Sequence, residues 1–137
     1  EAHRTDRVLV RAEEGWKPKR IGFEEGDAMN LRDGLGHFDR VLAANLLCRL
    51  PEPQRLLDRL PSLVRSGGEL ILTTPCTWLE EFTPPENWPE VGTFQWLRAR
   101  LQPSFELLEE HDEPFLIRET ARKFQWTVSQ VSKGGRR

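Results

Sequence analysis

The sequence predicts an α/β fold, in which a mostly parallel sheet carries helices and ends in an antiparallel pair of strands. The first observation behind this prediction is a strand–helix–glycine turn–strand pattern between residues 38 and 74, which is typical of a βαβ unit. The second is a pair of apolar, extended segments near residues 105–111 and 124–131. The third is the length of 137 residues, which fits one domain.

Two short apolar stretches set among charged residues predict strands near the N-terminus. They lie around Val8–Val10 and Ile21–Phe23, separated by a turn that contains Pro18. A longer apolar run, Phe38–Asn45, shows little alternation of apolar and polar residues. Such a run predicts a strand that is covered on both faces inside a parallel sheet.

The next segment has the pattern of an amphipathic helix. Beyond Pro53, apolar residues recur at the spacing of one buried helical stripe, at Leu56, Leu57, Leu60, Leu63 and Val64. Pro61 removes one backbone hydrogen bond from this helix, so we expect a kink or a break after Leu60. Ser66–Gly68 predicts the end of the helix, and Glu69–Thr74 predicts the next strand.

The C-terminal half begins with a proline-rich stretch, residues 75–92, that is typical of a long loop with a function. A short helix is expected around Thr93–Leu101. Phe105–His111 and Phe124–Val131 then predict the antiparallel pair, with Phe124, Trp126 and Val128 on one face. The last residues, Gly134–Arg137, are expected to form a solvated, frayed end.

Composition limits the classes of function. The chain has 20 Lys and Arg against 22 Asp and Glu, and a dedicated nucleic-acid binder needs a clustered positive field instead. No apolar run is long enough to span a membrane, and no secretory or lipidation signal is present. Two cysteines do not make a disulfide framework. We therefore expect a cytoplasmic protein that binds a small molecule, without nucleic acid or membrane partners.

Polar residues that follow the predicted strands are the candidate site, because ligands bind beyond the carboxyl ends of strands in an open parallel sheet. Asp27 can accept a hydrogen bond from a ligand amino group, or it can simply cap a turn. Asn45 offers a donor and an acceptor without charge, or it belongs to an ordinary strand-end turn. Glu80 and Glu81, beside Trp78, would hold a cationic substrate or be merely solvated.

Other chemistry-bearing motifs are weak or missing from the sequence. The three histidines and two cysteines lack metal-ligand spacing, so no metal site is predicted. The nucleophile elbow, P-loop and HExxH patterns do not occur, and neither does a GxGxxG loop.

Several segments together resemble the second half of class I methyltransferases, which use S-adenosylmethionine. They are Gly26-Asp27-Ala28, Phe38-Asp39-Arg40-Val41, the Ser66-Gly67-Gly68 turn and the final antiparallel pair. Residues 74–84 (TPCTWLEEFTP) and 114–125 (PFLIRETARKFQ) carry a more specific resemblance. It is to the mercaptohistidine N-methyltransferase domain of ovothiol biosynthesis, and it extends over roughly residues 16–132.

The resemblance implies the C-terminal portion of a Rossmann-like class I methyltransferase fold, with S-adenosylmethionine as the cofactor. It places Asp27 at the adenine amino group, with Ala28 and Met29 beside the adenine ring. Asn45 and Leu46 would face the methionine part of the cofactor and the methyl acceptor.

The acceptor implied by the resemblance is a small imidazole-thiol amino acid, mercaptohistidine, which is methylated on a ring nitrogen. Trp78 and Arg118 would shape its pocket, and Glu80 or Glu81 would accept its proton as catalytic groups. Methyl transfer of this kind uses no metal, and the iron of the pathway belongs to a different catalytic domain.

The family's glycine-rich loop and its ribose-binding acidic residue would precede this chain, which starts at Glu1 and has Met29 as its single methionine. We therefore expect residues 1–137 to be one N-terminally truncated domain that an upstream domain completes. Its strands would then have exposed edges. The alternatives are a catalytically inactive fragment or binding module without the glycine loop, and a methyltransferase with another small acceptor.

Overall fold

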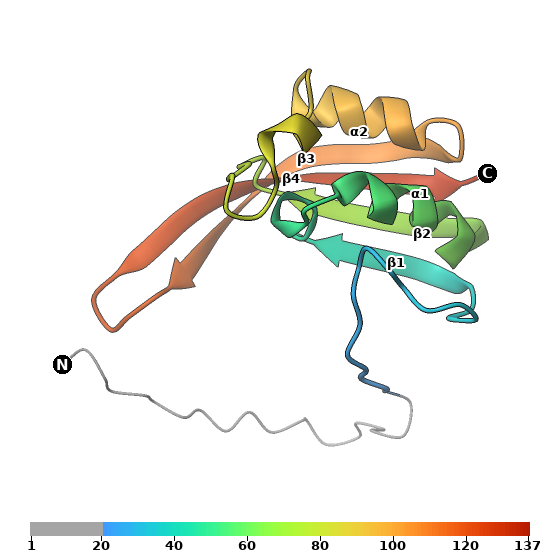
Figure 1. Ribbon diagram of the computed structural model, residues 1–137, viewed down its shortest axis with the longest axis horizontal. Helices are drawn as coiled ribbons and strands as arrows, with labels where there is room; N and C mark the ends of the chain where they lie inside the picture. The colour runs from blue at the N-terminus through green and yellow to red at the C-terminus, as the bar shows by residue number, and fades with distance from the viewer. Residues whose placement is uncertain (1–20) are drawn as a thin grey trace.

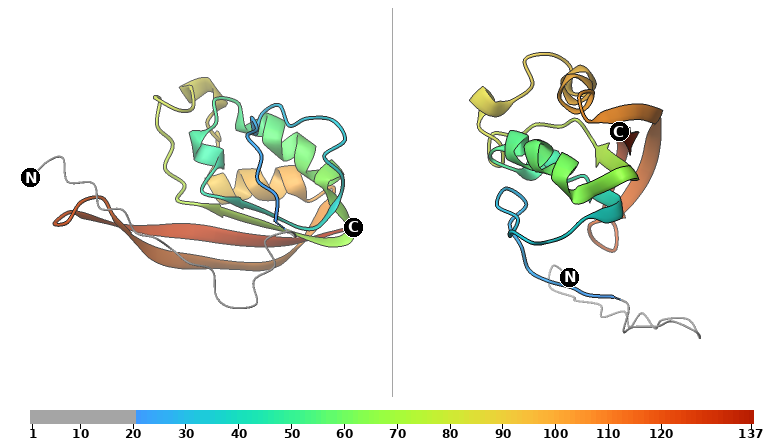
Figure 2. Two further views of the ribbon diagram at one scale, coloured as in Figure 1. Left: turned by 90° about the horizontal axis from the view of Figure 1, so that it is seen from below. Right: turned by 90° about the vertical axis from the view of Figure 1, so that its right-hand side faces the viewer.

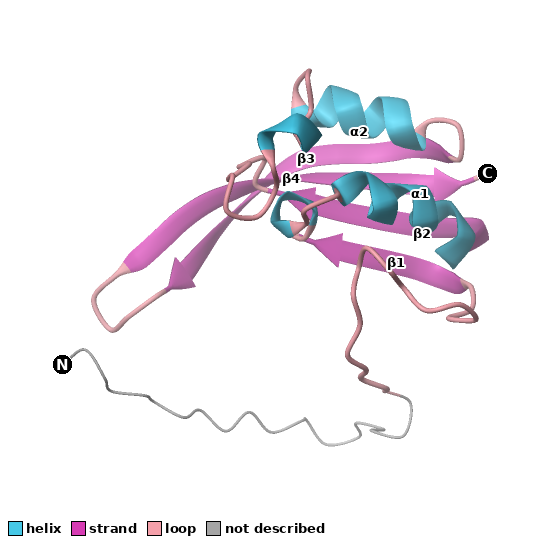
Figure 3. Cartoon of the chain, in the orientation of Figure 1, coloured by secondary structure: helices cyan, strands magenta, loops and turns pink. Residues whose placement is uncertain are grey.

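The computed structural model describes residues 21–137, which form one four-stranded sheet with its helices (Figure 1). The strand order is β1-β2-β4-β3. Figure 3 shows how the helical segments alternate with the strands along the chain. In chain order, the elements are β1 Phe38–Ala44, η2 Leu47–Arg49, α1 Pro53–Leu63, β2 Val64–Thr74, η3 Pro85–Asn87, α2 Thr93–Leu101, β3 Phe105–Arg118 and β4 Phe124–Arg136.

The predicted βαβ unit is confirmed, because β1 and β2 pair in parallel and α1 connects them. The register runs from Arg40 opposite Glu69 to Ala44 opposite Thr73. The predicted helical stripe is buried, with Leu56, Leu57, Leu60 and Leu63 each at most 4% exposed. Burial of a leucine side chain contributes about 1.5–3 kcal/mol, so this stripe holds α1 on the sheet.

Of the expected kink or break after Leu60, the break is wrong, because α1 continues through Pro61 to Leu63. Only two helical residues follow the proline, so its missing hydrogen bond affects the last turn alone. Two other contacts hold the end of the helix. The Val64 amide donates to the Leu60 carbonyl, and the Pro61 carbonyl accepts a hydrogen bond from Arg136 Nε at 3.2 Å.

The Ser66–Gly68 turn does not end the helix as predicted, because α1 ends at Leu63 and β2 already begins at Val64. The turn instead makes an irregularity in the ladder, where the partner of β1 jumps from Val64 to Glu69. Gly67 has a φ of +75°, a conformation that other residues rarely adopt. The glycine therefore serves the bulge in β2.

Strand β1 is not covered on both faces, which corrects the prediction for residues 38–45. It is the edge of the sheet, and Leu42 is 63% exposed. The predicted strand at Ile21–Phe23 is also wrong, because these residues form no strand and Phe23 is 94% exposed. The other N-terminal strand prediction, around Val8–Val10, lies outside the described residues.

The antiparallel pair is confirmed but is longer than predicted. The β2–β4 ladder ends where Thr74 faces Gln130, whereas the β3–β4 ladder continues for six further pairs to Arg118 opposite Phe124. At ~3.3 Å per residue, this hairpin extends about 20 Å beyond β2 (Figure 1). The expected frayed end is wrong, because Gly134 pairs with Leu70 on one side and Leu107 on the other.

Both helices, α1 and α2, lie on the same face of the sheet (Figure 2). The buried core lies between them and this face, and it includes Leu60 of α1, Leu70 and Leu72 of β2, and Leu97 of α2. Within residues 21–137, no helix covers the opposite face of the sheet. None of the helices in this part of the chain is long and apolar enough to cross a membrane.

Candidate functional site

The carboxyl ends of β1 and β2 carry the strained backbone of the described chain. Asn45, just after β1, has a φ of +50°, and Cys76, two residues after β2, has a φ of +54°. No other non-glycine residue in 21–137 has a positive φ. Strained residues cluster at functional sites, and the carboxyl edge of parallel strands is where ligands bind in open sheets.

Asn45 is held by hydrogen bonds from two other strands. Its Oδ1 accepts from Thr73 Oγ1 at 2.9 Å and from Ser129 Oγ at 2.8 Å. Its backbone amide donates to the Thr73 carbonyl at 2.9 Å and lies 3.0 Å from Thr73 Oγ1. The Nδ2 group makes no hydrogen bond within the described residues, so it is the part of this side chain that can bind a ligand.

Cys76 is an exposed thiol that points toward β4. Its Sγ lies 3.7 Å from both the Thr74 carbonyl and Gln130 Oε1, and its amide donates to Thr74 Oγ1 at 3.1 Å. Desolvation raises the pKa of the Cys76 thiol above its ordinary value, although hydrogen bonds with Thr93 and Thr74 oppose the shift. At neutral pH the thiol is therefore protonated and a poor nucleophile.

Asp27 caps a turn, which was one of its two predicted roles. Its Oδ1 accepts from the Met29 amide at 2.9 Å, and its carbonyl accepts from the Asn30 amide at 3.0 Å. Oδ2 forms no hydrogen bond within the described residues, and the side chain is exposed. One carboxylate oxygen thus remains available to a ligand.

The turn at Asp27 and the end of β1 line the same groove. Ala28 and Leu46 both line it, together with Val41 of β1 and Leu56 of α1, and its volume is about 310 Å³. Met29 fixes the turn on the start of α1, since its Sδ accepts a hydrogen bond from the Glu52 amide at 3.4 Å. The structure therefore brings the Asp27–Met29 turn and Leu46 together.

Trp78 fastens the loop after β2 to helix α2. Its Nε1 donates to Thr93 Oγ1 at 2.9 Å, and its ring packs edge-on against Trp96 with 6.0 Å between the ring centroids. The half-buried Trp78 ring thus holds the loop against α2. Its contact with an acceptor stays a prediction.

Glu80 and Glu81 are exposed and lie in a turn that the rest of the molecule holds firmly. The buried Thr83 hydroxyl donates to the Leu50 carbonyl at 2.8 Å, and Trp88 Nε1 donates to the Thr83 carbonyl at 2.7 Å. Neither carboxylate forms an ion pair within residues 21–137. Both are free to accept a proton or to bind a cation.

Arg118 lies apart from the other predicted site residues, at the far end of β3 in the projecting hairpin (Figure 1). Its Nε donates to the Thr120 carbonyl at 3.1 Å, which fixes the hairpin turn. In the same hairpin, Leu116, Trp126 and Phe124 remain more than half exposed.

Sequence reasoning missed the residues that support Asn45, namely Thr73 and Ser129. The alternation in residues 124–131 does put Ser129 on the polar face of its strand. Pairing partners in a sheet depend on register, however, and a single sequence does not specify the register of strands this far apart.

Comparison with solved structures identifies the fold. The structure is similar to the N-methyltransferase NodS from Bradyrhizobium japonicum WM9 in complex with S-adenosyl-L-homocysteine, with a TM-score of 0.58, 14% identity and coverage of 86% of this chain. It is also similar to a structure concerned with converting a disulfide bond into a thioacetal group during echinomycin biosynthesis, with a TM-score of 0.60, 14% identity and 86% coverage. A SAM-dependent methyltransferase from Methanosarcina mazei gives a TM-score of 0.54 at 17% identity and 81% coverage.

The chain spans 57% of the first two structures and 65% of the third. No protein-family model and no curated protein matches the sequence. At these identities the likeness concerns the fold. The chain therefore has the α/β fold of S-adenosylmethionine-dependent methyltransferases, as the sequence predicted.

Proposed function

We propose that this chain is part of a cytoplasmic S-adenosylmethionine-dependent N-methyltransferase that acts on mercaptohistidine in the ovothiol pathway. The observation that carries the proposal is the pair of strained residues, Asn45 and Cys76, at the carboxyl ends of two adjacent parallel strands. Of the two segments that resemble the mercaptohistidine methyltransferase, residues 74–84 follow β2 at this edge, and residues 114–125 form the hairpin that projects beyond it.

The residues present fit one end of S-adenosylmethionine. The free Oδ2 of Asp27 would accept a hydrogen bond from the adenine amino group, and the half-buried Ala28 and Met29 offer apolar contact to the ring. The unpartnered Nδ2 of Asn45 would donate to the methionine part, with Leu46 next to it. When bound, the cofactor supplies a methyl group whose bond to sulfur breaks as the acceptor nitrogen bonds to that carbon.

The chain's own contribution to the reaction would be alignment and proton removal. In-line displacement requires the two reactants to be positioned and water to be kept out, which suits a loop fixed by Trp78 and Thr83. A ring nitrogen attacks only without its proton. The exposed carboxylate of Glu80 or Glu81 would accept that proton.

A further domain that completes the fold is part of this proposal. The outer edge of β1 carries no neighbouring strand in the described residues, and the apolar Phe38 and Leu42 of this strand are 41% and 63% exposed. Open, apolar edges are aggregation sites that proteins normally cover. An upstream segment that pairs with β1 would cover this edge and add the missing cofactor loop.

The test is transfer of a labelled methyl group by the full-length protein to mercaptohistidine and to histidine. We expect transfer to mercaptohistidine, and loss of about 10²–10⁴-fold in kcat when the proton acceptor is replaced in Glu80→Gln or Glu81→Gln. Glu86→Gln, an exposed carboxylate in η3, is the matched control and should keep wild-type activity. Transfer to histidine at an equal rate would contradict the assignment of the acceptor.

The second candidate is a binding module without catalysis. It is favoured by the internal use of Asn45 Oδ1 and Asp27 Oδ1, because both atoms already accept hydrogen bonds from the protein. Binding of S-adenosyl-L-homocysteine by the full-length protein, with no transfer to any thiol-imidazole acceptor, would support this reading.

A further inference from the structure

A second cavity lies between α2 and the sheet, and its lining shares no residue with the groove at the candidate site. Its volume is about 240 Å³, and its apolar lining comes from Leu70, Leu72, Phe94, Leu97, Leu101 and Phe105. On β4 it contacts Ser132 and Gly134, which pair with Leu72 and Leu70 in the second half of β2. The candidate site begins beyond Thr74, where this half of β2 ends.

The β4 residues that line this space, Ser132 and Gly134, are small, but Phe105 fills the place above Gly134, so the open space lies over Ser132. Leu72 and Leu70 of β2 are paired with Ser132 and Gly134 of β4. Beneath α2, the sheet therefore carries large side chains on β2 and small ones on β4. Leu97 of α2 is 2% exposed and belongs to the same buried cluster as Leu70 and Leu72. A Cβ at Gly134 would lie 3.2 Å from Phe105 Cβ, so Phe105 occupies the place that a side chain would need.

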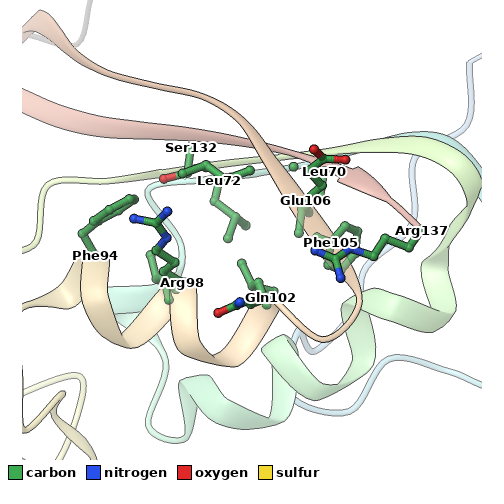
Figure 4. A pocket seen from close by; sticks show the side chains of 13 residues that line it. Leu70, Leu72, Phe94, Arg98, Gln102, Phe105, Glu106, Ser132 and Arg137 are labelled. Atoms are coloured by element: carbon green, nitrogen blue, oxygen red, sulfur yellow. The ribbon is translucent and has the colours of Figure 1, made fainter.

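The mouth of the cavity is positively charged. Figure 4 shows Arg98 beside Phe94 at one end and Arg137 beside Phe105 at the other. Neither guanidinium forms an ion pair or a side-chain hydrogen bond within residues 21–137. Glu106 is the single carboxylate among the lining side chains, so two cations face one anion.

We propose that this cavity is a binding site for a small carboxylate with one aromatic ring or a short alkyl chain. An apolar cavity of about 150 Å³ accepts benzene, and pockets for drug-sized ligands have volumes of about 300–1,000 Å³. The space beneath α2 falls between these sizes, which selects a one-ring body. The carboxylate then binds Arg98 at one end of the cavity or Arg137 at the other through charge-assisted hydrogen bonds.

The test uses the full-length protein and the probe 3-phenylpropionate, with its uncharged amide as the comparison ligand. Binding is followed by methyl NMR at Leu72 and Leu97, which line the cavity, and at Leu56 and Leu57, which do not. We expect shifts at the first pair only. The acid should bind about tenfold more tightly than the amide, the size of one hydrogen bond to a charged group.

Substitutions at the arginines test the contribution of charge to binding, and a substitution at Ser132 tests the contribution of the cavity. The double variant Arg98→Gln/Arg137→Gln should remove most of the preference for the acid, and so should the single substitution of whichever arginine binds it, while Arg100→Gln should not. Arg100 lies on the same helix outside the lining and meets Asp58 at 3.5 Å. Ser132→Leu should fill the space and abolish binding of both probes.

Several results would overturn the proposal. They are equal affinity for acid and amide, a preference for the acid that survives Arg98→Gln and Arg137→Gln, methyl shifts at Leu56 and Leu57 instead, or no binding of either probe by the folded protein.

Discussion

Asn45 Oδ1 accepts a hydrogen bond from Ser129 Oγ at 2.8 Å, which joins β1 to β4 although the two strands are not neighbours in the sheet. The same oxygen accepts from Thr73 Oγ1 of β2, the strand between them. One side chain at a strained position thus ties three strands together at the edge where the candidate site lies.

This relationship predicts the stability of two variants. Asn45→Gly removes the acceptor and leaves two hydroxyl donors without their partner, so the free energy of unfolding should fall by about 1–3 kcal/mol. Asn45→Ala should be less stable again by about 1 kcal/mol, because alanine resists the φ of +50° that glycine adopts freely. Urea unfolding measures both values, and Asn30→Ala, an exposed asparagine, is the control. Equal stability of the alanine variant and the wild type would show that the hydrogen bonds of Asn45 Oδ1 to Thr73 and Ser129 do not stabilise the fold.

The loop after β2 depends on the Trp78–Thr93 hydrogen bond. Thr93→Val keeps the side-chain shape but removes the acceptor of Trp78 Nε1, which should cost about 0.5–1.5 kcal/mol and loosen the loop. Hydrogen exchange of amides in residues 77–83 should become faster. Thr77→Val serves as the control, since the Thr77 hydroxyl contacts only the nearby Pro75 carbonyl. Unchanged exchange in Thr93→Val would show that the ring packing alone holds the loop.

The charge cluster on the helix-free face of the sheet predicts a dependence on pH. The hydrogen bond from Lys133 lowers the pKa of Glu69 below its ordinary value of 4.5; burial opposes this, and Arg40 adds a second hydrogen bond. A carboxylate with a lowered pKa contributes stability above pH 4.5, and this contribution is lost as the pH falls from 4.5 through the lowered pKa.

Lys133→Met removes the first of these causes, so the pKa of Glu69 should rise toward 4.5 in a carboxyl NMR titration. The stability difference between this variant and the wild type should shrink as the pH falls below 4.5. Lys123→Met, which removes an exposed partner of Glu119 in the hairpin, should leave the Glu69 titration unchanged. A Glu69 pKa that stays low in Lys133→Met would assign the shift to Arg40 instead.

Local patterns in the sequence predict the elements whose residue spacing alone identifies them as helix or strand. The leucine spacing from Leu56 to Leu63 identifies α1 because a helix places those residues on one face, whatever the rest of the fold does. The bounds Thr93–Leu101 of α2 also agree with the prediction. The antiparallel pair follows from alternation, which needs no knowledge of distant residues.

Features that depend on distant partners were not predictable in this way. The apolar run of β1 is typical of a buried strand, but its place at the edge depends on which neighbours the described chain supplies. Gly134 and Gly135 suggest a flexible end, yet ladders on both sides hold them in β4. In the site, Asn45 stood out as a polar residue after a strand, and Asp27 stood out after a predicted strand that the structure does not form. Ser129 is recognisable only from the register.

The most direct test of the central claim is calorimetric titration of the full-length protein with S-adenosyl-L-homocysteine. Asp27→Ala removes the carboxylate proposed to meet the adenine amino group, so the dissociation constant should rise about tenfold or more. Asp33→Ala, an exposed aspartate in the same connecting segment, should bind like the wild type. If the wild type binds and Asp27→Ala binds equally well, or if the folded wild type does not bind at all, the proposed cofactor site is contradicted.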